Sequence, residues 1–182
     1  MKKLCITVIL TICTISQTRE TPLPDKEIIV LRPKVDLSKL EDIDTVITDL
    51  VHLHPAFRNK VIDLMVLCNK EGIELKVSET YRSVSRQNKL RSYGSHVTTL
   101  VGGDSRHQHG LAIDVVPYRR HKLAWNESTL NRIGRLAEGL GLGWGGRWRK
   151  PYDPGHLEWK IKTEDLRAGI LPHTPDTVKI PI

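Results

Sequence analysis

The stretch Ser105–Val116, which reads SRHQHGLAIDVV, places two histidines and a glycine directly before an apolar run that contains a carboxylate. The run Leu111–Val116 is rich in β-branched residues and lies between Gly110 and Pro117, a pattern that predicts a mostly buried strand. A buried carboxylate is costly unless it is paired or bound to a metal. Asp114 therefore predicts either a metal site or an ion pair with an arginine beside a solvated histidine loop.

A second segment, Asp153–Trp159, supplies a further histidine, His156, with an acid three residues before it. Histidine, aspartate and glutamate are usual zinc ligands, and a hydrolytic zinc site keeps three protein ligands and one open position. The two segments together predict a site for one zinc ion.

The spacing of these residues resembles that of the zinc peptidases that cut bacterial cell-wall peptides. That family comprises D-alanyl-D-alanine carboxypeptidases, including vancomycin-resistance types, and L-alanyl-D-glutamate endopeptidases. The resemblance covers about residues 50–160, with five motifs in the family's order. The motifs are Leu53-His54-Pro55, then Glu79-Thr80-Tyr81-Arg82-Ser83 followed by Gln87, then SxHxxGxAxD at Ser105, His107, Gly110, Ala112 and Asp114, then Gly143-Trp144-Gly145-Gly146-Arg147-Trp148, and DxxHxEW at Asp153, His156, Glu158 and Trp159.

The resemblance implies that His107, Asp114 and His156 are the zinc ligands, because His107 stands at the family's spacing from Asp114. His109 is the alternative to His107. Asp153 stands in the position of the family's general base, which activates water and returns the proton to the leaving amine. Tyr152–Gly155 is also a good turn sequence, and Asp153 can serve both purposes.

Arg82 stands where the family's arginine holds a substrate carboxylate or the developing oxyanion, and its planar fork suits either task. Without the resemblance, the alternative interpretation of Arg82 is an arginine on the protein surface. Four further residues are candidate substrate contacts: Gln87, Ser105, Trp144 and Trp148. Glu158 is expected to hydrogen-bond a ligand histidine from outside the site.

The pattern along the chain predicts an α+β fold, because helices precede a few short strands. Helices are expected over residues 40–53, 57–70 and 83–92, from 126 or 128 to 140, and briefly after Thr163. Strands are expected over residues 73–77, 111–116 and 157–161. The resemblance implies a small antiparallel sheet that carries the zinc site, flanked by helices.

The two ends of the chain are expected to lie outside the peptidase domain. Residues 1–16 have the charged start and short apolar run of a signal peptide, although an uncleaved anchor or a lipoprotein site at Cys13 are alternatives. Residues 17–36 are expected to be an extended lead-in, residues 37–170 the zinc peptidase domain, and residues 171–182 a tail. The protein is therefore expected to be exported to the periplasm, the cell envelope or the medium, with membrane contact only through an uncleaved N-terminal segment.

The charge of the chain favours polyanionic neighbours. The formal charge is +7, and loss of Lys2 and Lys3 with a signal peptide leaves 26 basic against 21 acidic residues, a charge of +5. No nucleic-acid-binding motif appears in the sequence, so nucleic acid is not expected as a partner. Cys68 would be the one cysteine left after cleavage, so no intramolecular disulfide is expected. The expected partners are peptidoglycan stem peptides, and the expected state is a monomer.

The predicted function is cleavage of the L-alanyl-D-glutamate bond of peptidoglycan, with D-alanyl-D-alanine carboxypeptidase activity as the alternative. The glycine-tryptophan loop at 143–148 and the Asp in the base position resemble the endopeptidases, whereas Arg147 stands where these often carry an acid. A zinc-stabilised, non-catalytic cell-wall-binding module is the alternative of another class. Asp153 argues against it, because a structural zinc site fills all four positions with protein ligands.

Overall fold

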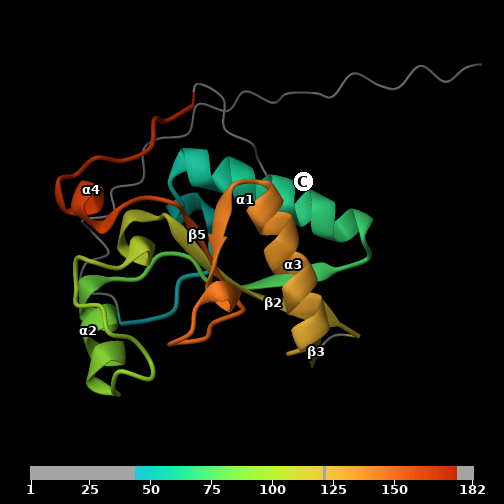
Figure 1. Cartoon of the computed structure of the whole chain (residues 1–182), viewed down its shortest axis with the longest axis horizontal. Helices are drawn as coiled ribbons and strands as arrows, with labels where there is room; N and C mark the ends of the chain where they lie inside the picture. Colours follow the sequence, from blue (N-terminus) through green and yellow to red (C-terminus); the bar gives the residue numbers. More distant parts are fainter. Residues whose placement is uncertain (1–43, 121, 176–182) are drawn as a thin grey trace, which may run out of the picture.

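The computed structural model describes residues 44–120 and 122–175 (Figure 1). The expected signal peptide, the expected lead-in at 17–36 and the last residues of the expected tail lie outside the described residues. Across the described ranges, none of the helices is long and apolar enough to cross a membrane.

A five-stranded antiparallel sheet packs against helices, which confirms the α+β prediction (Figure 1). The strand order is β1-β2-β5-β4, and β3 pairs with the end of β2. The strands are β1 (Glu74–Glu79), β2 (Ala112–Arg119), β3 (Lys122–Leu123), β4 (Leu142–Trp144) and β5 (His156–Trp159). The helices are α1 (Pro55–Lys70), α2 (Val84–Ser92), α3 (Glu127–Gly139) and α4 (Thr163–Arg167), with short 3-10 turns η2 (Leu50–His52), η3 (Arg106–His109) and η4 (Gly145–Arg147).

Helix α1 supplies one side of the core. It begins with Pro55 in the first turn, where a missing N–H is harmless, and the His54 ring accepts a hydrogen bond from the Ala56 N–H. It ends before Gly72, whose φ of 70° is left-handed. Its buried face consists of residues spaced three or four apart: Phe57, Val61, Leu64 and Cys68. Helix α3 contacts both α1 and β4, so the two helices cover the same side of the sheet.

The alternation of side chains along the strands separates the core from the site. Ile113 and Val115 of β2 and Leu157 of β5 belong to the hydrophobic core under the helices. Successive side chains of a strand point to opposite faces, so Asp114 and His156 project from the other face. The helices bury one face of the sheet and leave the polar residues of β2 and β5 for the site.

The expected helix over residues 40–53 is wrong for residues 44–49, which are not helical; its first residues lie outside the described ranges. The backbone carbonyls of Ile47 and Asp49 instead accept hydrogen bonds from Thr80, at the end of β1. Tertiary hydrogen bonds thus replace the helical ones that the apolar spacing suggested. The short strands β3 and β4 were not expected either, whereas Asn126 caps α3 as predicted.

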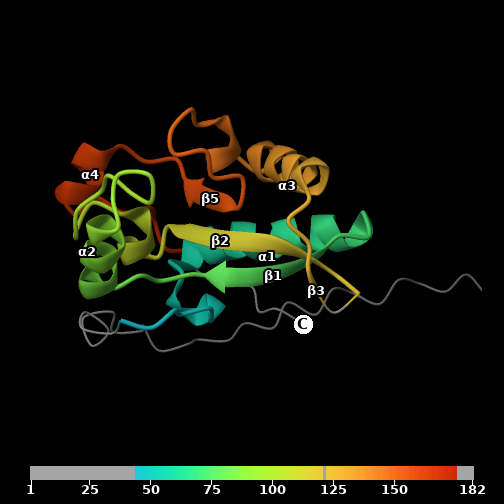
Figure 2. The same ribbon diagram turned by 90° about the horizontal axis from the view of Figure 1, so that it is seen from below.

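The two ends of β2 lie in different surroundings. In both ribbon views β3 lies at one end of the sheet, and α2 and α4 lie at the other (Figure 2). The candidate site lies toward the α2 end.

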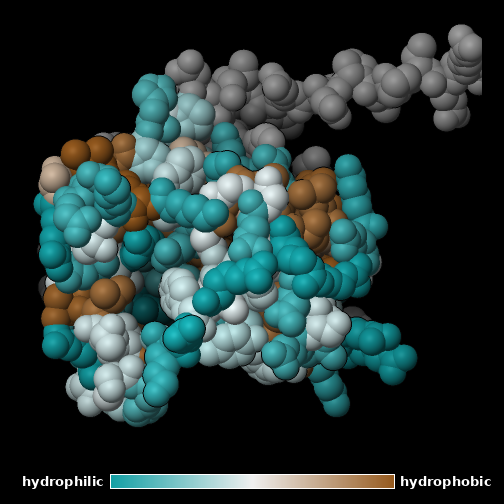
Figure 3. Space-filling model, viewed as in Figure 1, coloured by the Kyte–Doolittle hydropathy of each residue, from teal (hydrophilic) through white to brown (hydrophobic). Residues whose placement is uncertain are grey.

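The face of the molecule in Figure 3 is mostly hydrophilic, as the high content of charged residues predicts.

Candidate metal centre

Strand register brings the first two candidate ligands together. Asp114 of β2 lies directly opposite His156 of β5, and both side chains project from the face away from the helices. On the other side of β2, Glu79 pairs with Asp114 because an irregularity between Val77 and Glu79 shifts the register of β1. Such a bulge re-aims a side chain, and here it places a second acid beside Asp114.

The third ligand comes from the turn η3, which a close backbone contact holds against the start of α1. The Gly110 carbonyl accepts a hydrogen bond from the His54 N–H at 2.8 Å. A Cβ at Gly110 would lie 2.6 Å from the His52 carbonyl oxygen, and its φ is 64°. Only glycine fits this position, which explains the glycine three residues after His107 in the motif.

The ligand atoms of His107, Asp114 and His156 converge. His107 Nε2 lies 3.3 Å from His156 Nδ1 and 3.4 Å from Asp114 Oδ1. Asp114 Oδ1 lies 2.9 Å from His156 Nδ1. These are the three side chains, among the described residues, whose potential ligand atoms all lie within 4.8 Å of one another. The structure therefore brings the three predicted ligand residues together at one point.

Contacts outside the cluster fix which nitrogen of each imidazole faces inward. The His107 Nδ1–H donates to the Thr80 carbonyl at 2.8 Å, which leaves Nε2 for the centre. His156 Nε2 lies 3.2 Å from Glu158 Oε2, which leaves Nδ1 for the centre. Two imidazoles with outer acceptors and one carboxylate are the donor set of a zinc site. The residues present therefore fit a zinc ion.

The electrostatics of the cluster favour a cation. Burial raises the pKa of the Asp114 carboxyl, but the charge of His107 and hydrogen bonds from His107 and His156 hold it well below its usual range. Burial also lowers the pKa of His156, but hydrogen bonds to the carboxylates of Asp114 and Glu158 outweigh this and raise it. The carboxylates thus stabilise positive charge at this point, whether a proton or a metal supplies it.

Arg82 connects the cluster to β1. Its Nε and Nη2 atoms donate to Glu79 Oε2, and Nη2 also lies 3.4 Å from Asp114 Oδ2. Its Nη1 donates to the Gln87 side-chain oxygen at 3.1 Å. Arg82 therefore holds the outer oxygen of Asp114 while Oδ1 faces the imidazoles.

A cavity of about 300 Å³ opens beside the cluster. Its wall includes the three ligand residues together with Asp153, Arg82, Arg86, Ser105 and Trp148. The Trp148 ring lies 4.9 Å from the His156 ring. The candidate ligands and the candidate base therefore border one space large enough to admit part of a peptide.

Asp153 lies at the turn before β5. Its backbone carbonyl accepts from the His156 N–H at 3.2 Å, so the turn and the ligand are directly coupled. Burial, and then the charge of Asp114, raise the pKa of the Asp153 carboxyl. No ion pair joins Asp153 to another described residue. An unpaired carboxylate with a raised pKa in the cavity wall is placed to exchange protons.

Two expected substrate contacts are not in the cavity wall. Trp144 lies in the core, where its indole N–H donates to the Pro154 carbonyl and its ring fills the space left by Gly134 and Gly146. Gln87 is fully buried, and its amide nitrogen bonds Thr98 and the Leu100 carbonyl. The amide of Gln87 and the indole of Trp144 both make their contacts inside the protein. These two residues therefore support the site and do not line the cavity.

The alternative ligand His109 points elsewhere. Its Nε2 lies 3.1 Å from the Gly103 carbonyl oxygen, outside the cluster. Glu79 and Arg86 have no role predicted from the sequence, although both lie close to the tyrosine-arginine-serine motif at residues 81–83. The sequence feature that could have indicated these two residues is an acid and a second arginine close to Arg82. The bulge that turns Glu79 toward Asp114 cannot be recognised in the residue pattern.

Comparisons with known proteins give the family of this chain. Residues 100–159 match the sequence profile of a peptidase M15 family described as D-alanyl-D-alanine carboxypeptidase. The peptidoglycan L-alanyl-D-glutamate endopeptidase CwlK of Bacillus subtilis (strain 168) is 31% identical over 121 residues, which cover 58% of this chain and 72% of CwlK. The crystal structure of the Serratia marcescens L-Ala D-Glu endopeptidase ChiX is 26% identical, with a TM-score of 0.51, and the match covers 72% of this chain and 99% of ChiX. The likeness to CwlK over most of its length shows that this chain belongs to the M15 family of peptidases.

Proposed function

We propose that this M15 peptidase is a zinc-dependent endopeptidase that hydrolyses the bond between L-alanine and D-glutamate in peptidoglycan stem peptides. The observation that carries the proposal is the single cavity bordered by three convergent ligand residues and by Asp153. The choice of bond is supported by CwlK and ChiX, both named as endopeptidases for it.

The proposed ligands are His107 through Nε2, Asp114 through Oδ1 and His156 through Nδ1. A zinc ion held there would supply a Lewis acid that polarises the scissile carbonyl and lowers the pKa of water. The Thr80 carbonyl and the Glu158 carboxylate hold the two imidazoles in the required orientation.

Asp153 is the proposed general base. Its raised pKa makes the carboxylate a better proton acceptor than an exposed aspartate. It would take a proton from the attacking water and pass it to the leaving amine. Arg82 lies in the same wall, so its positive charge is placed to stabilise negative charge that develops on the carbonyl oxygen.

Two other functions are the alternatives to this proposal. The matching family profile is described as a D-alanyl-D-alanine carboxypeptidase, which makes removal of the terminal D-alanine the second candidate. A non-catalytic zinc-stabilised module is less well supported, because a structural zinc site needs neither a nearby acid nor a cavity beside three ligands.

The test is digestion of a defined stem pentapeptide, L-Ala-γ-D-Glu-L-Lys-D-Ala-D-Ala, by the zinc-loaded protein, with fragments identified by mass spectrometry. The proposal expects free L-alanine and the tetrapeptide that begins with D-glutamate. Release of the terminal D-alanine alone would support the carboxypeptidase instead. Absence of any cleavage, with zinc bound, would favour the binding module.

We also propose that the protein acts outside the cytoplasm after cleavage following Ser16. The charged start and short apolar run of residues 1–16 support this. N-terminal sequencing of the protein from the producing cells would give Gln17 as the first residue. An intact Met1 on protein from the cell envelope would favour an uncleaved anchor.

A further inference from the structure

The wall of the cavity contains three arginines, and they differ in how many of their donors are used. Arg82 directs Nε and Nη2 to Glu79, Nη2 also to Asp114 and Nη1 to Gln87. The Nη2 atom of Arg106 donates to the Ile161 carbonyl, and its Nε faces Glu158 at 3.4 Å.

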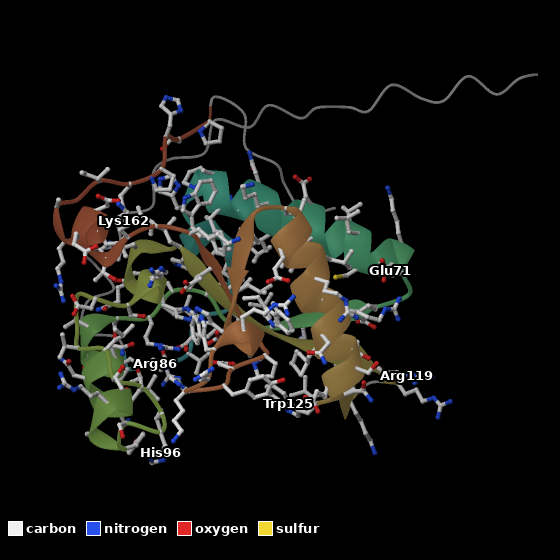
Figure 4. All side chains as sticks on the ribbon, viewed as in Figure 1. Glu71, Arg86, His96, Arg119, Trp125 and Lys162 are labelled. Atoms are coloured by element: carbon white, nitrogen blue, oxygen red, sulfur yellow. The ribbon has the colours of Figure 1, made fainter. Side chains whose placement is uncertain are left out.

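Arg86 of α2 is different. Its Nε donates to Glu79 Oε1 at 2.6 Å, whereas its two Nη atoms make no hydrogen bond within the described part of the chain. Its side chain borders the cavity and is 19% exposed, against 7% for Glu79. The Nε edge of the guanidinium is therefore anchored to a buried carboxylate, and the two Nη atoms are left for a ligand. In Figure 4 Arg86 lies beside α2, between this helix and the centre of the molecule.

The Nη edge of the Arg86 guanidinium is suited to bind an anion. Glu79 faces both Arg82 and Arg86, and Arg82 also contacts Asp114, so Arg86 has only a shared carboxylate as its partner among the described residues. The two Nη atoms of a guanidinium form a fork that matches a carboxylate. Because Glu79 fixes the Nε edge, little side-chain freedom remains to be lost when an anion binds.

We propose that Arg86 binds the free α-carboxylate of the D-glutamyl residue and makes the enzyme select stems that carry this carboxylate over stems in which it is an amide. This inference rests on the proposed cleavage between L-alanine and D-glutamate. In that substrate the α-carboxylate sits on the carbon that carries the scissile nitrogen. It must therefore lie in the same cavity as the ligand residues when the bond is cut, and Arg86 is the cavity arginine with both outer nitrogens available.

The experiment compares two peptides that differ only at this group, L-Ala-γ-D-Glu-L-Lys and L-Ala-γ-D-isoglutaminyl-L-Lys. The ratio of their kcat/KM values is measured for the zinc-loaded wild type, Arg86→Gln and Arg91→Gln. Arg91 is an exposed residue of the same helix outside the cavity wall, so its variant matches the charge change. General damage to the enzyme lowers both rates and leaves the ratio unchanged.

The wild type is expected to prefer the carboxylate peptide by about 10- to 100-fold, the range of a hydrogen-bonded charge. Arg86→Gln should lower this ratio at least about tenfold, mainly through a higher KM for the carboxylate peptide, and Arg91→Gln should keep the wild-type ratio. Arg86→Lys keeps the positive charge but loses the paired Nη donors, so it should give an intermediate ratio. This variant takes the place of Arg86→Gln if the glutamine variant does not fold.

A wild-type ratio near one, or an unchanged ratio in Arg86→Gln or Arg86→Lys, would overturn the role of Arg86 while the proposed function stands. Cleavage of neither peptide at this bond by the wild type would overturn the proposed function and this inference with it.

Discussion

The Nε2 atom of His107 lies 3.3 Å from the Nδ1 atom of His156, and each ring has its other nitrogen bonded to an acceptor outside the pair. The two inward nitrogens therefore face one point, where a metal ion can accept a lone pair from each. The Asp114 carboxylate, 2.9 Å from the same His156 atom, completes a set of three donors. This relationship is the basis for the zinc assignment.

The first prediction separates the two histidines of η3. His107→Ala removes a ligand atom, so the variant should bind zinc at least about tenfold more weakly, as expected when a metal site is damaged. His109→Ala should keep one zinc per chain, since His109 faces the Gly103 carbonyl. Elemental analysis after dialysis measures both. If His109→Ala lost zinc and His107→Ala kept it, His109 would be the ligand and His107 would not.

The second prediction concerns the proposed base. Asp153→Asn removes the proton acceptor but none of the three ligands, so zinc content should stay at the wild-type level. The kcat for a stem peptide should fall by about 10²- to 10⁴-fold, the usual contribution of a positioned base. Turnover by Asp153→Asn at the wild-type rate would remove Asp153 from the mechanism.

The third prediction tests the packing of Trp144 beneath the site. A Cβ at Gly134 would lie 2.2 Å from the Trp144 ring, so Gly134→Ala should destabilise the protein by about 2 kcal/mol despite the better helix propensity of alanine. Gly139, in the same helix, has open space where its Cβ would be, and Gly139→Ala should be neutral or stabilise by up to about 1 kcal/mol. Denaturant unfolding gives both values. Equal effects of the two substitutions would show that the indole is not fixed there.

The fourth prediction is a pH dependence of stability. Burial, and then the charge of Glu71, raise the pKa of the Cys68 thiol from 9.0 to about 11. Between these values the unfolded chain releases a proton that the folded chain retains, so the contribution of Cys68 to stability falls as the pH rises. Wild type should lose about 1 kcal/mol relative to Cys68→Ala between about pH 8 and about pH 10.

Denaturant unfolding at the two pH values measures this difference, and the Cys68→Ala variant removes the titration of all other groups from the comparison. Parallel pH profiles for the two proteins would mean that the thiol ionises as freely in the folded chain as in the unfolded one.

The closeness of His107 and Asp114 could be predicted from the sequence because it is encoded locally, whereas His156 joins them through the pairing of β2 with β5. The spacing from His107 to Asp114 reflects one turn that only Gly110 can close and one strand in which Asp114 faces away from the core. The distinction between His107 and His109 followed from the family's spacing, and the structure shows its physical basis in the Thr80 carbonyl that orients His107.

The parts that could not be predicted depend on contacts between distant segments. The apolar spacing in residues 40–53 suggested a helix, but Ile47 and Asp49 bond to Thr80, about thirty residues away in the sequence, and local propensity yields to such contacts. The roles of Glu79 and Arg86 depend on a bulge in β1 and on the packing of α2. Trp144 was expected in the cleft, because the two glycines that make room for its ring are identifiable only in three dimensions.

Anomalous diffraction from crystals of the zinc-loaded protein, measured on both sides of the zinc absorption edge, tests the metal centre most directly. The expected result is one peak in contact with His107 Nε2, Asp114 Oδ1 and His156 Nδ1, with Asp153 in the wall of the adjoining cavity. A zinc peak bound to His109 instead, or no peak at these three side chains in protein that carries one zinc per chain, would contradict the account.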